Sequence, residues 1–492
     1  MEGDAGSGST TPGLTRDSCL DAIIIALNET CHGKKKSWYT STKELQLASL
    51  EFCIACRNHQ TLHLVVDAQV PRRLLAAADA SPQEAKRLCW TRVPRLRARR
   101  VTWNISTTWE LRNPIFAISD VDSLRFGRAV EGSLEAVAWP QRLETIFFSH
   151  LAPFNQPIDQ VQWPVSLQRL VFGWSFNQRI ENVSWPDSLQ VLAFGFAFNQ
   201  PIDLVQWPAS LQELEFEVRF NQRIEDVSWP DSLEILEFGR EFNQPVEGVS
   251  WPDSLRVLAF GDHFNQPIEG VVWPASLKQI IFSVDSHFDH PIEHVAWPTC
   301  LEKVVFGEIF NQPIARATFP ASLQELSFAG EFNQPIEGVS WPNSIRRLEL
   351  GASFNKPIDN VRWPASLREI KFGWGTEGDN RMVICSEFNQ RIDNCVWPLS
   401  LRWLTLGDEF RQSLKGLGTW IPNLEGFRLL DYLDYDPGGG SLLRGIEWPK
   451  GLRQLTVFED SDLDGVEIPS TVKVSYPLND IHYRRARAGL AV

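Results

Sequence analysis

The stretch Trp229–Ser250, WPDSLEILEFGREFNQPVEGVS, decides the fold, because closely similar copies recur along most of the chain. Each copy opens with a Trp-Pro pair, except one that opens with Phe319-Pro320. The copies are 22 residues apart wherever no insertion intervenes. The opening residues of the twelve clear units are Trp139, Trp163, Trp185, Trp207, Trp229, Trp251, Trp273, Trp297, Phe319, Trp341, Trp363 and Trp397. Repetition at this period is typical of a solenoid.

One unit predicts its own local structure. Leu236 and Phe238 alternate with Glu237, which is the period-2 pattern of a short strand with one buried face. Gly239 permits a turn directly after the strand, and Pro252 blocks a continuing helix. No stretch has room for a long helix, so the return side should consist of loops, short 3₁₀ turns or a second short strand. A lone turn cannot bury its apolar residues, so the units should stack into a curved parallel solenoid.

Two repeated polar residues admit a structural and a ligand-binding interpretation. An Asn follows Phe in nearly every unit, as at Asn221 and Asn243, with Asp289 as the exception. We expect an interior ladder that bonds to the main chain of adjacent turns, rather than a row of ligand-binding amides. The repeated Trp is expected to fill the core, with its indole N–H bonded to one partner, rather than to form a stacking platform.

These residues resemble the FNIP repeat, a 22-residue variant of the leucine-rich repeat. Its pattern, P-x-S-L-x-x-L-x-F-G-x-x-F-N-x-P-I, is matched by Pro186–Ile202 and Pro252–Ile268, and the resemblance covers roughly Trp139 to Trp420. This chain departs from the pattern by placing Trp before Pro and by using Arg179, Arg223 and Arg391 where Pro is usual. The resemblance implies an interaction scaffold, sometimes joined to an F-box, with no catalytic residues. Part of the unit is also similar to repeats of some bacterial surface proteins.

Composition narrows the class of protein. A net charge of −14 and a pI near 5.2 argue against nucleic-acid binding. The eight Cys are scattered without a paired framework, which favours a reducing environment. The segment Met1–Pro12 lacks a basic region before an apolar run, and no apolar stretch could span a bilayer. We therefore expect an intracellular, cytoplasmic protein without a membrane span.

The sequence divides into four predicted parts: a tail (1–16), an α-rich N-terminal cap domain (17–110), the repeat array (111–417), and degenerate repeats with a C-terminal cap (418–492). Degenerate units should begin at Trp420, Trp448 and Ile468. In the cap domain, a capping box at Ser41–Glu44 predicts a helix over Thr42–Asn58. Because one helix cannot surround a zinc ion, Cys53, Cys56, His59 and His63 are interpreted as cap residues rather than a metal site. The basic stretch Arg92–Arg100 is either a solvated face, a localisation signal or a phosphate-facing patch.

The functional residues should be those at the variable positions (x) of L-x-x-L-x-F, whose side chains lie on the exposed strand face. They are acidic early in the array, at Glu213, Glu215 and Glu237, and apolar in the middle. The apolar positions are Val257, Ala259, Ile281 and Val305. Late positions are basic or aromatic, namely Arg346, Arg347, Arg368, Lys371, Arg402 and Trp403. A face of this kind would suit a protein partner of opposite polarity, although solvated sheet positions would give the same letters.

Insertions directly after the strand should line one rim of the solenoid. They occur near Ser149–Pro153, Ser283–His287, Trp374–Glu387 and Asp431–Gly440. The last contains Asp431, Tyr432, Asp434 and Tyr435, which we include among the candidate partner-binding residues. Asp431, Asp434 and Asp436 could together hold calcium, but the remaining ligands of a recognised loop are missing and a plain acidic turn is preferred.

No pattern in the sequence indicates an enzyme or a cofactor. The sequence has neither a phosphate-binding Gly-rich loop nor a nucleophile elbow, and its nine His are dispersed. We therefore expect a non-enzymatic scaffold that binds a protein through its strand face and insertion rim. The alternatives are a substrate-recognition adaptor of a ubiquitin ligase, although the leading Leu-Pro of an F-box is missing, and a surface or carbohydrate-binding repeat protein.

Overall fold

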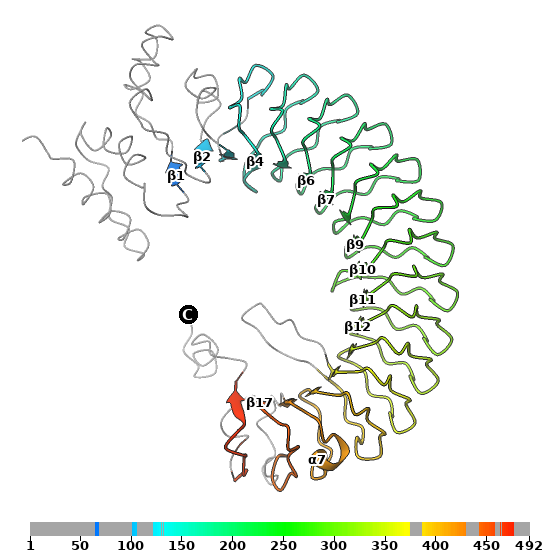
Figure 1. The fold of residues 1–492 in the computed structure, drawn as a ribbon. Helices are drawn as coiled ribbons and strands as arrows, with labels where there is room; N and C mark the ends of the chain where they lie inside the picture. The colour runs from blue at the N-terminus through cyan, green and yellow to red at the C-terminus, as the bar shows by residue number, and fades with distance from the viewer. Residues whose placement is uncertain are drawn as a thin grey trace, which may run out of the picture.

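The computed structural model describes residues 64–67, 101–105, 122–128, 130, 132–373, 386–429, 442–457, 463 and 465–476. These residues form a parallel solenoid in which each turn contributes one short strand to a single 18-stranded sheet. Every strand pairs in parallel with the next strand along the chain, as β7 does with β8 and β8 with β9 (Figure 1). The predicted fold, a leucine-rich-repeat-like parallel solenoid, is confirmed.

The strands are three to five residues long. Their bounds are β1 Leu64–Asp67, β2 Val101–Ile105, β3 Ser123–Phe126, β4 Thr145–Phe148, β5 Arg169–Val171, β6 Val191–Phe194, β7 Glu213–Phe216, β8 Ile235–Glu237, β9 Val257–Phe260, β10 Gln279–Phe282, β11 Lys303–Phe306, β12 Glu325–Phe328, β13 Arg347–Leu350, β14 Glu369–Phe372, β15 Trp403–Leu406, β16 Gly426–Leu429, β17 Gln454–Val457 and β18 Lys473–Ser475. The one helix of the described residues is α7, Leu417–Trp420.

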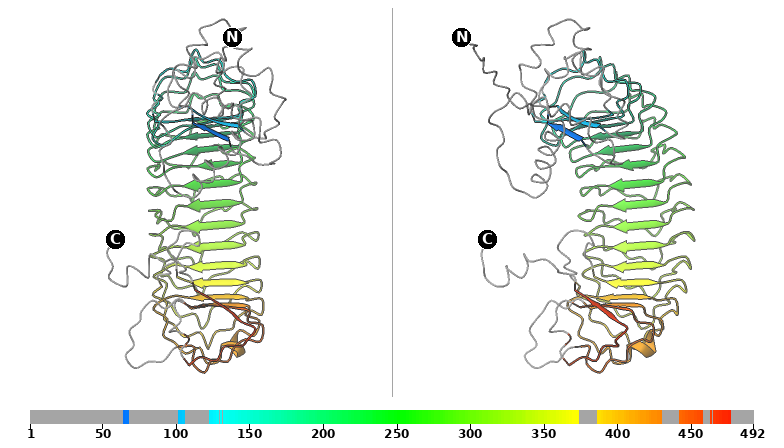
Figure 2. Two further views of the ribbon diagram at one scale, coloured as in Figure 1. Left: turned by 90° about the vertical axis from the view of Figure 1, so that its left-hand side faces the viewer. Right: turned by 60° about the vertical axis from the view of Figure 1, so that its left-hand side comes forward.

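The sheet lines the concave side of an arc, and the return segments form its outer side (Figures 1 and 2). The side chains that fill each turn explain this curvature. Equivalent rings in successive turns are 5.6 Å apart at the strand (Phe194 and Phe216) and 6.2 Å apart beyond it (Phe176 and Phe198). On the return side the separation reaches 6.5 Å, between Trp163 and Trp185. Because parallel strands stack at only about 4.8 Å, each turn is a wedge that is thicker on its outer side.

The core repeats with the sequence. In the unit quoted above, Leu233, Leu236 and Phe242 are completely buried, and Trp229 is only 8% exposed. Between Trp139 and Glu409 the described return segments consist of turns and irregular chain, without 3₁₀ helix or a second strand. Loops were therefore the correct one of the three expected return conformations, and Pro in every unit explains why no helix forms.

The Asn ladder is present, but it lies at the surface rather than in the interior. The Asn221 Oδ1 accepts hydrogen bonds from the Asn243 backbone N–H at 3.0 Å and from the Gln244 side chain at 2.9 Å. Asn221 and Asn243 are only half-buried. The bonding to the main chain was predicted, whereas the role of the neighbouring Gln was not. A second ladder, also not predicted, joins the Ser before the first Leu of most units to a main-chain carbonyl of the preceding turn, as from Ser232 to Leu211 at 2.6 Å.

The stacked indoles fill the core as expected, but the prediction of one partner for each indole N–H was wrong. Among the described residues, the indole nitrogens that are buried without a hydrogen-bond acceptor include those of Trp163, Trp185, Trp207, Trp229, Trp251, Trp273, Trp297, Trp341 and Trp363. Trp397 does donate, to the Ile392 carbonyl at 3.0 Å. Packing of the large rings therefore stabilises this row without help from hydrogen bonds.

The degenerate units predicted from Trp420, Trp448 and Ile468 each lead into a strand, namely β16, β17 and β18. At the other end, β1 and β2 precede β3 in the same sheet. The predicted helix over 42–58, with Cys53, Cys56, His59 and His63, lies outside the described residues, as do the whole basic stretch 92–100 and the loop 431–440. The four-part division of the chain stays a prediction.

Candidate functional site on the concave face

The side chains that alternate with the buried strand residues form the concave face. In β7, Leu214 and Phe216 are buried, whereas Glu213 and Glu215 are half-exposed. The in-register pairing places equivalent positions of adjacent turns side by side, so Glu215 lies directly next to Glu237 of β8. The face is therefore a set of rows that run across the strands, and each row is decided by one letter of the repeat.

One row of the late strands is a ladder of alternating charges. Lys303 of β11 pairs with Glu325 of β12 at 3.5 Å, and Glu325 also pairs with Arg347 of β13 at 3.5 Å. Arg347 pairs in turn with Glu369 of β14 at 3.0 Å. Partial burial lowers the pKa of Arg347, but the charges of Glu369 and Glu325 outweigh it, and the pKa is raised overall. The ion pairs with Glu325 and Glu369 thus hold the Arg347 guanidinium against the sheet.

The other residues predicted as a basic surface are only partly available to a partner. Arg402 pairs with Glu425 at 3.3 Å, and the Arg428 guanidinium lies over the Trp403 ring at 5.2 Å. Lys371 is only 5% exposed. Arg346 and Arg368 are exposed. The late face is therefore of mixed charge, not basic as predicted, because the sequence interpretation omitted the carboxylates in the same rows.

The early acidic residues are arranged differently. Among the described residues no ion pair joins Glu213, Glu215 or Glu237 to a cation. Burial and the neighbouring Glu213 raise the pKa of Glu215, and Arg169 of β5 only partly offsets them. Burial, Glu215 and Glu213 likewise raise the pKa of Glu237. Like charges in register destabilise a sheet, so this arrangement has a cost that the alternating ladder avoids.

Apolar side chains surround these carboxylates on the face. Val191 and Ile235 flank Glu213 in its row, and Ala193 and Ala259 flank the Glu215–Glu237 pair. Val257, Ala259, Ile281 and Val305, the apolar positions predicted from the sequence, are all half-buried on the strand face. Carboxylates and apolar groups thus share one continuous surface from β6 to β11.

The rim beside the strand ends carries an aromatic row that the sequence analysis missed. The described insertions at 149–153 and 283–287 directly follow β4 and β10, as predicted. His150, in the first of them, lies 6.1 Å from the Trp174 ring, which lies 5.8 Å from Phe196. The Arg219 guanidinium covers Phe196 at 5.0 Å. A signal was available, since Trp174 and Phe196 are one 22-residue repeat apart in the sequence.

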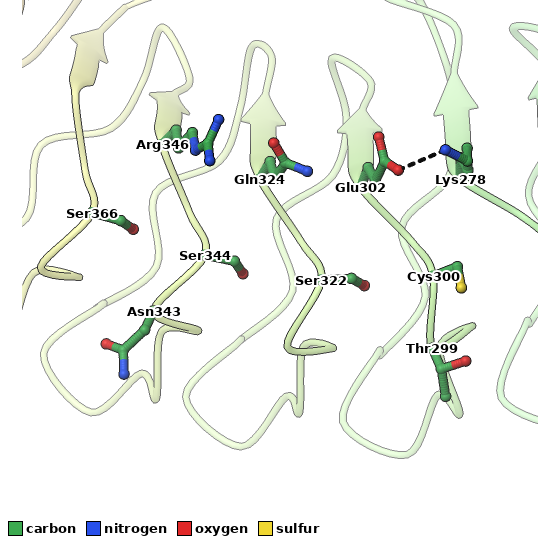
Figure 3. A pocket seen from close by; sticks show the side chains of 10 residues that line it. All are labelled: Lys278, Thr299, Cys300, Glu302, Ser322, Gln324, Asn343, Ser344, Arg346 and Ser366. Carbon is green, nitrogen blue, oxygen red and sulfur yellow. Dashed lines mark hydrogen bonds and ion pairs between the residues drawn. The ribbon is translucent and has the colours of Figure 1, made fainter.

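The opposite ends of the strands border a shallow depression of about 430 Å³ (Figure 3). Lys278, Glu302, Gln324 and Arg346 line it from successive turns, and Lys278 and Glu302 form an ion pair at 2.9 Å. The exposed Cys300 lies there too, at the position that Ser occupies in other units. The lining is a row of surface side chains rather than the wall of an enclosed cavity.

Two further observations concern the described ranges only. No group of three or more His, Cys, Asp or Glu in them is placed to hold a metal ion, and no helix in them is long and apolar enough to cross a membrane. The candidate residues Asp431, Tyr432, Asp434 and Tyr435 lie outside these ranges, so their predicted role is untested.

Several solved structures resemble the chain, and three of them are compared with it by identity, coverage and TM-score. CroV588, described as a circular LRR protein, is 26% identical, with 77% of this chain and 69% of that one covered and a TM-score of 0.39. The TLR13–ssRNA13 complex is 14% identical, with 76% and 62% covered and a TM-score of 0.42. An internalin from Listeria monocytogenes is 12% identical, with 64% and 82% covered and a TM-score of 0.31. A comparison with curated proteins gave no match.

The family comparison agrees with the repeat described above. The FNIP repeat model matches residues 154–197, 198–241, 242–285 and 332–374, each of which spans about two units of the solenoid. The matched segments include the Phe, Asn and Leu positions that build the core and the Asn ladder. The chain therefore carries FNIP repeats in these segments, and its repeats stack into a leucine-rich-repeat-like solenoid.

Proposed function

We propose that the chain is a non-enzymatic scaffold that binds a protein partner on the concave face between β6 and β11. The observation that carries this proposal is the contrast between two parts of one sheet. The row from Lys303 to Glu369 neutralises its charges internally, whereas Glu213, Glu215 and Glu237 lie among apolar side chains and form no ion pair within the described part of the chain. A partner that supplies positive charge and apolar surface would remove the cost of that arrangement.

Site-specific photo-cross-linking tests the proposal directly. A photoreactive amino acid replaces Val257 or Ile281 on the strand face, and matched variants carry it at Leu204 or Val272 on the return segments, which are 68% and 82% exposed. We expect a discrete cross-linked protein from the face positions in native lysate. Cross-links from the return positions alone would contradict the proposal, and so would the absence of cross-links from the face.

The ligase-adaptor and carbohydrate-binding alternatives gain no specific support from the described residues. An adaptor would use the N-terminal segment, whose expected helix lies outside them. A carbohydrate site would need exposed aromatic rings beside a cleft. The repeated Trp are buried, as at Trp251 with 8% exposure, and the partly exposed Trp174 does not line the shallow depression. The strand face is therefore the surface that we propose for partner binding.

A further inference from the structure

One departure from the repeat adds a charge directly after β7. Four neighbouring units place Gly after the strand, at Gly173, Gly195, Gly239 and Gly261, but the β7 unit has Glu217 there. The residues that recur in every unit are needed for folding, since they fill the core or join adjacent turns. A departure that adds a charge to the sheet has no such explanation, and it directs attention to the surface around it.

Glu217 connects the acidic strand positions to the aromatic rim. Its carboxylate accepts a hydrogen bond from the Phe196 backbone N–H, and His150 lies close enough to lower its pKa. Burial is the larger effect, so the pKa of Glu217 is raised overall, as it is for Glu215 beside it. We define the acidic–aromatic patch as Glu213, Glu215, Glu217, Glu237, Trp174 and Phe196.

The aromatic part of the patch remains partly open. Arg219 covers Phe196, whereas Trp174 is 46% exposed. Leu151, in the insertion after β4, is 49% exposed and adds apolar surface on the same rim. A large aromatic ring left in solvent beside carboxylates favours a cation, because the ring face attracts positive charge and the carboxylates neutralise it.

The chain itself shows which cation suits such rings. Arg125 lies over Phe147 at 4.7 Å, Arg219 over Phe196 at 5.0 Å and Arg428 over Trp403 at 5.2 Å. A guanidinium can stack on an aromatic ring and bond to a carboxylate at once, which an ammonium does less well. We propose that the acidic–aromatic patch binds an arginine side chain presented by an extended, apolar-flanked segment of the partner protein. This inference rests on the proposed function and names the chemistry of that partner.

The probe for the test is a fluorescent Leu-Arg-Val-Arg-Leu peptide, titrated into the full chain and followed by anisotropy. Its control peptide has citrulline, a neutral isostere, in place of arginine. We expect the arginine peptide to bind and the citrulline peptide to bind about tenfold more weakly, which is a loss of about 1.4 kcal/mol shared between the two lost charge contacts. Equal binding of the two peptides would overturn the inference.

Matched variants separate the patch from the overall negative charge. The double variant E215Q/E237Q should weaken arginine-peptide binding about tenfold, and W174A should weaken it about threefold. The variant E325Q/E369Q removes the same net charge from the paired ladder and should leave binding unchanged. Equal losses in the two double variants would mean that net charge alone attracts the peptide, and the inference would fall.

Two outcomes assign a failure to its source. If Val257 still cross-links a protein but E215Q/E237Q does not reduce the cross-link, the proposed function stands and the arginine inference is wrong. If the peptide binds only when Arg92, Arg95, Arg97, Arg99 and Arg100 are changed to Gln, the chain's own basic segment occupies the patch. That result would overturn the assignment to a partner.

Discussion

Removing one rung of the Asn ladder should destabilise the solenoid locally, and Asn221→Ala is the perturbation that tests this. The Asn221 Oδ1 accepts from the Asn243 backbone N–H at 3.0 Å and from Gln244 at 2.9 Å. Gln244 keeps a second acceptor, the Asn221 carbonyl at 3.2 Å, but the Asn243 N–H loses its side-chain acceptor. An unsatisfied donor costs about 1–3 kcal/mol and a neutral hydrogen bond about 0.5–1.5 kcal/mol. Because Asn243 is half-buried and water reaches it in part, we expect a loss of about 2 kcal/mol.

The chain supplies its own matched control for this substitution. Asp289 occupies the same repeat position, and its Oδ1 accepts from the Asn311 backbone N–H at 2.9 Å. Asn221→Asp should therefore keep the main-chain bond and lose well under half as much stability as Asn221→Ala. The comparison isolates the acceptor oxygen from the remainder of the side chain.

Hydrogen–deuterium exchange read by mass spectrometry suits this test, because a long repeat array need not unfold in one step. A loss of about 2 kcal/mol corresponds to about thirtyfold faster exchange in peptides from the turns that contain Asn221 and Asn243. Exchange in the β13–β15 turns should change much less. The reasoning is refuted if Asn221→Ala exchanges like the wild type, or if Asn221→Asp is as fast as Asn221→Ala.

Three further predictions follow from the same contacts. The pKa values of Glu215 and Glu237 are raised, so the charged forms of these side chains oppose folding, and wild-type stability should fall as pH rises through those pKa values. The variant E215Q/E237Q should therefore be more stable than the wild type at pH 7, by roughly 0.2–1 kcal/mol per charge. In urea titrations this difference in stability should vanish near pH 4. Iodoacetamide mapping at pH 8 should label the exposed Cys300 much faster than Cys395, where burial raises the pKa of the thiol to about 12, and equal rates would contradict this. Gly239→Ala places a Cβ 1.6 Å from the Glu217 carbonyl oxygen and should cost about 1–3 kcal/mol, whereas Gly451→Ala, with its nearest atom at 3.5 Å, should be nearly neutral in thermal melts.

The sequence predicted the solenoid because each repeated letter occupies the same environment in every turn. One unit with Leu233, Leu236 and Phe238 was enough to place the strand and its buried face. The burial of Asn221 and the partners of the Trp indoles were not predictable in this way. They depend on the distance between turns, which is set by the wedge shape and is not written in any single unit.

The charge pattern of the face was available in the sequence but had to be read across units. Glu325, Arg347 and Glu369 follow one another at the 22-residue period, so their alternation is visible once the units are aligned. The late face was predicted to be cationic because only its basic residues were considered. In a parallel solenoid the neighbours of a side chain are one period away rather than two or four residues away, and its electrostatic environment must be read along that direction.

The same alignment distinguishes residues that build the solenoid from residues that use it. A repeated letter must satisfy two neighbouring turns at once, and this constraint explains Gly239, whose Cβ would meet the Glu217 carbonyl. A residue that differs from those at the same position of the other units is either free of that constraint or is kept despite it. Glu217 departs by placing a partly buried charge where Gly is the rule, next to other carboxylates. Because burial of that carboxylate outweighs the hydrogen bond that it accepts from Phe196, its charge does not favour folding, and the turn around β7 is where binding should be sought first.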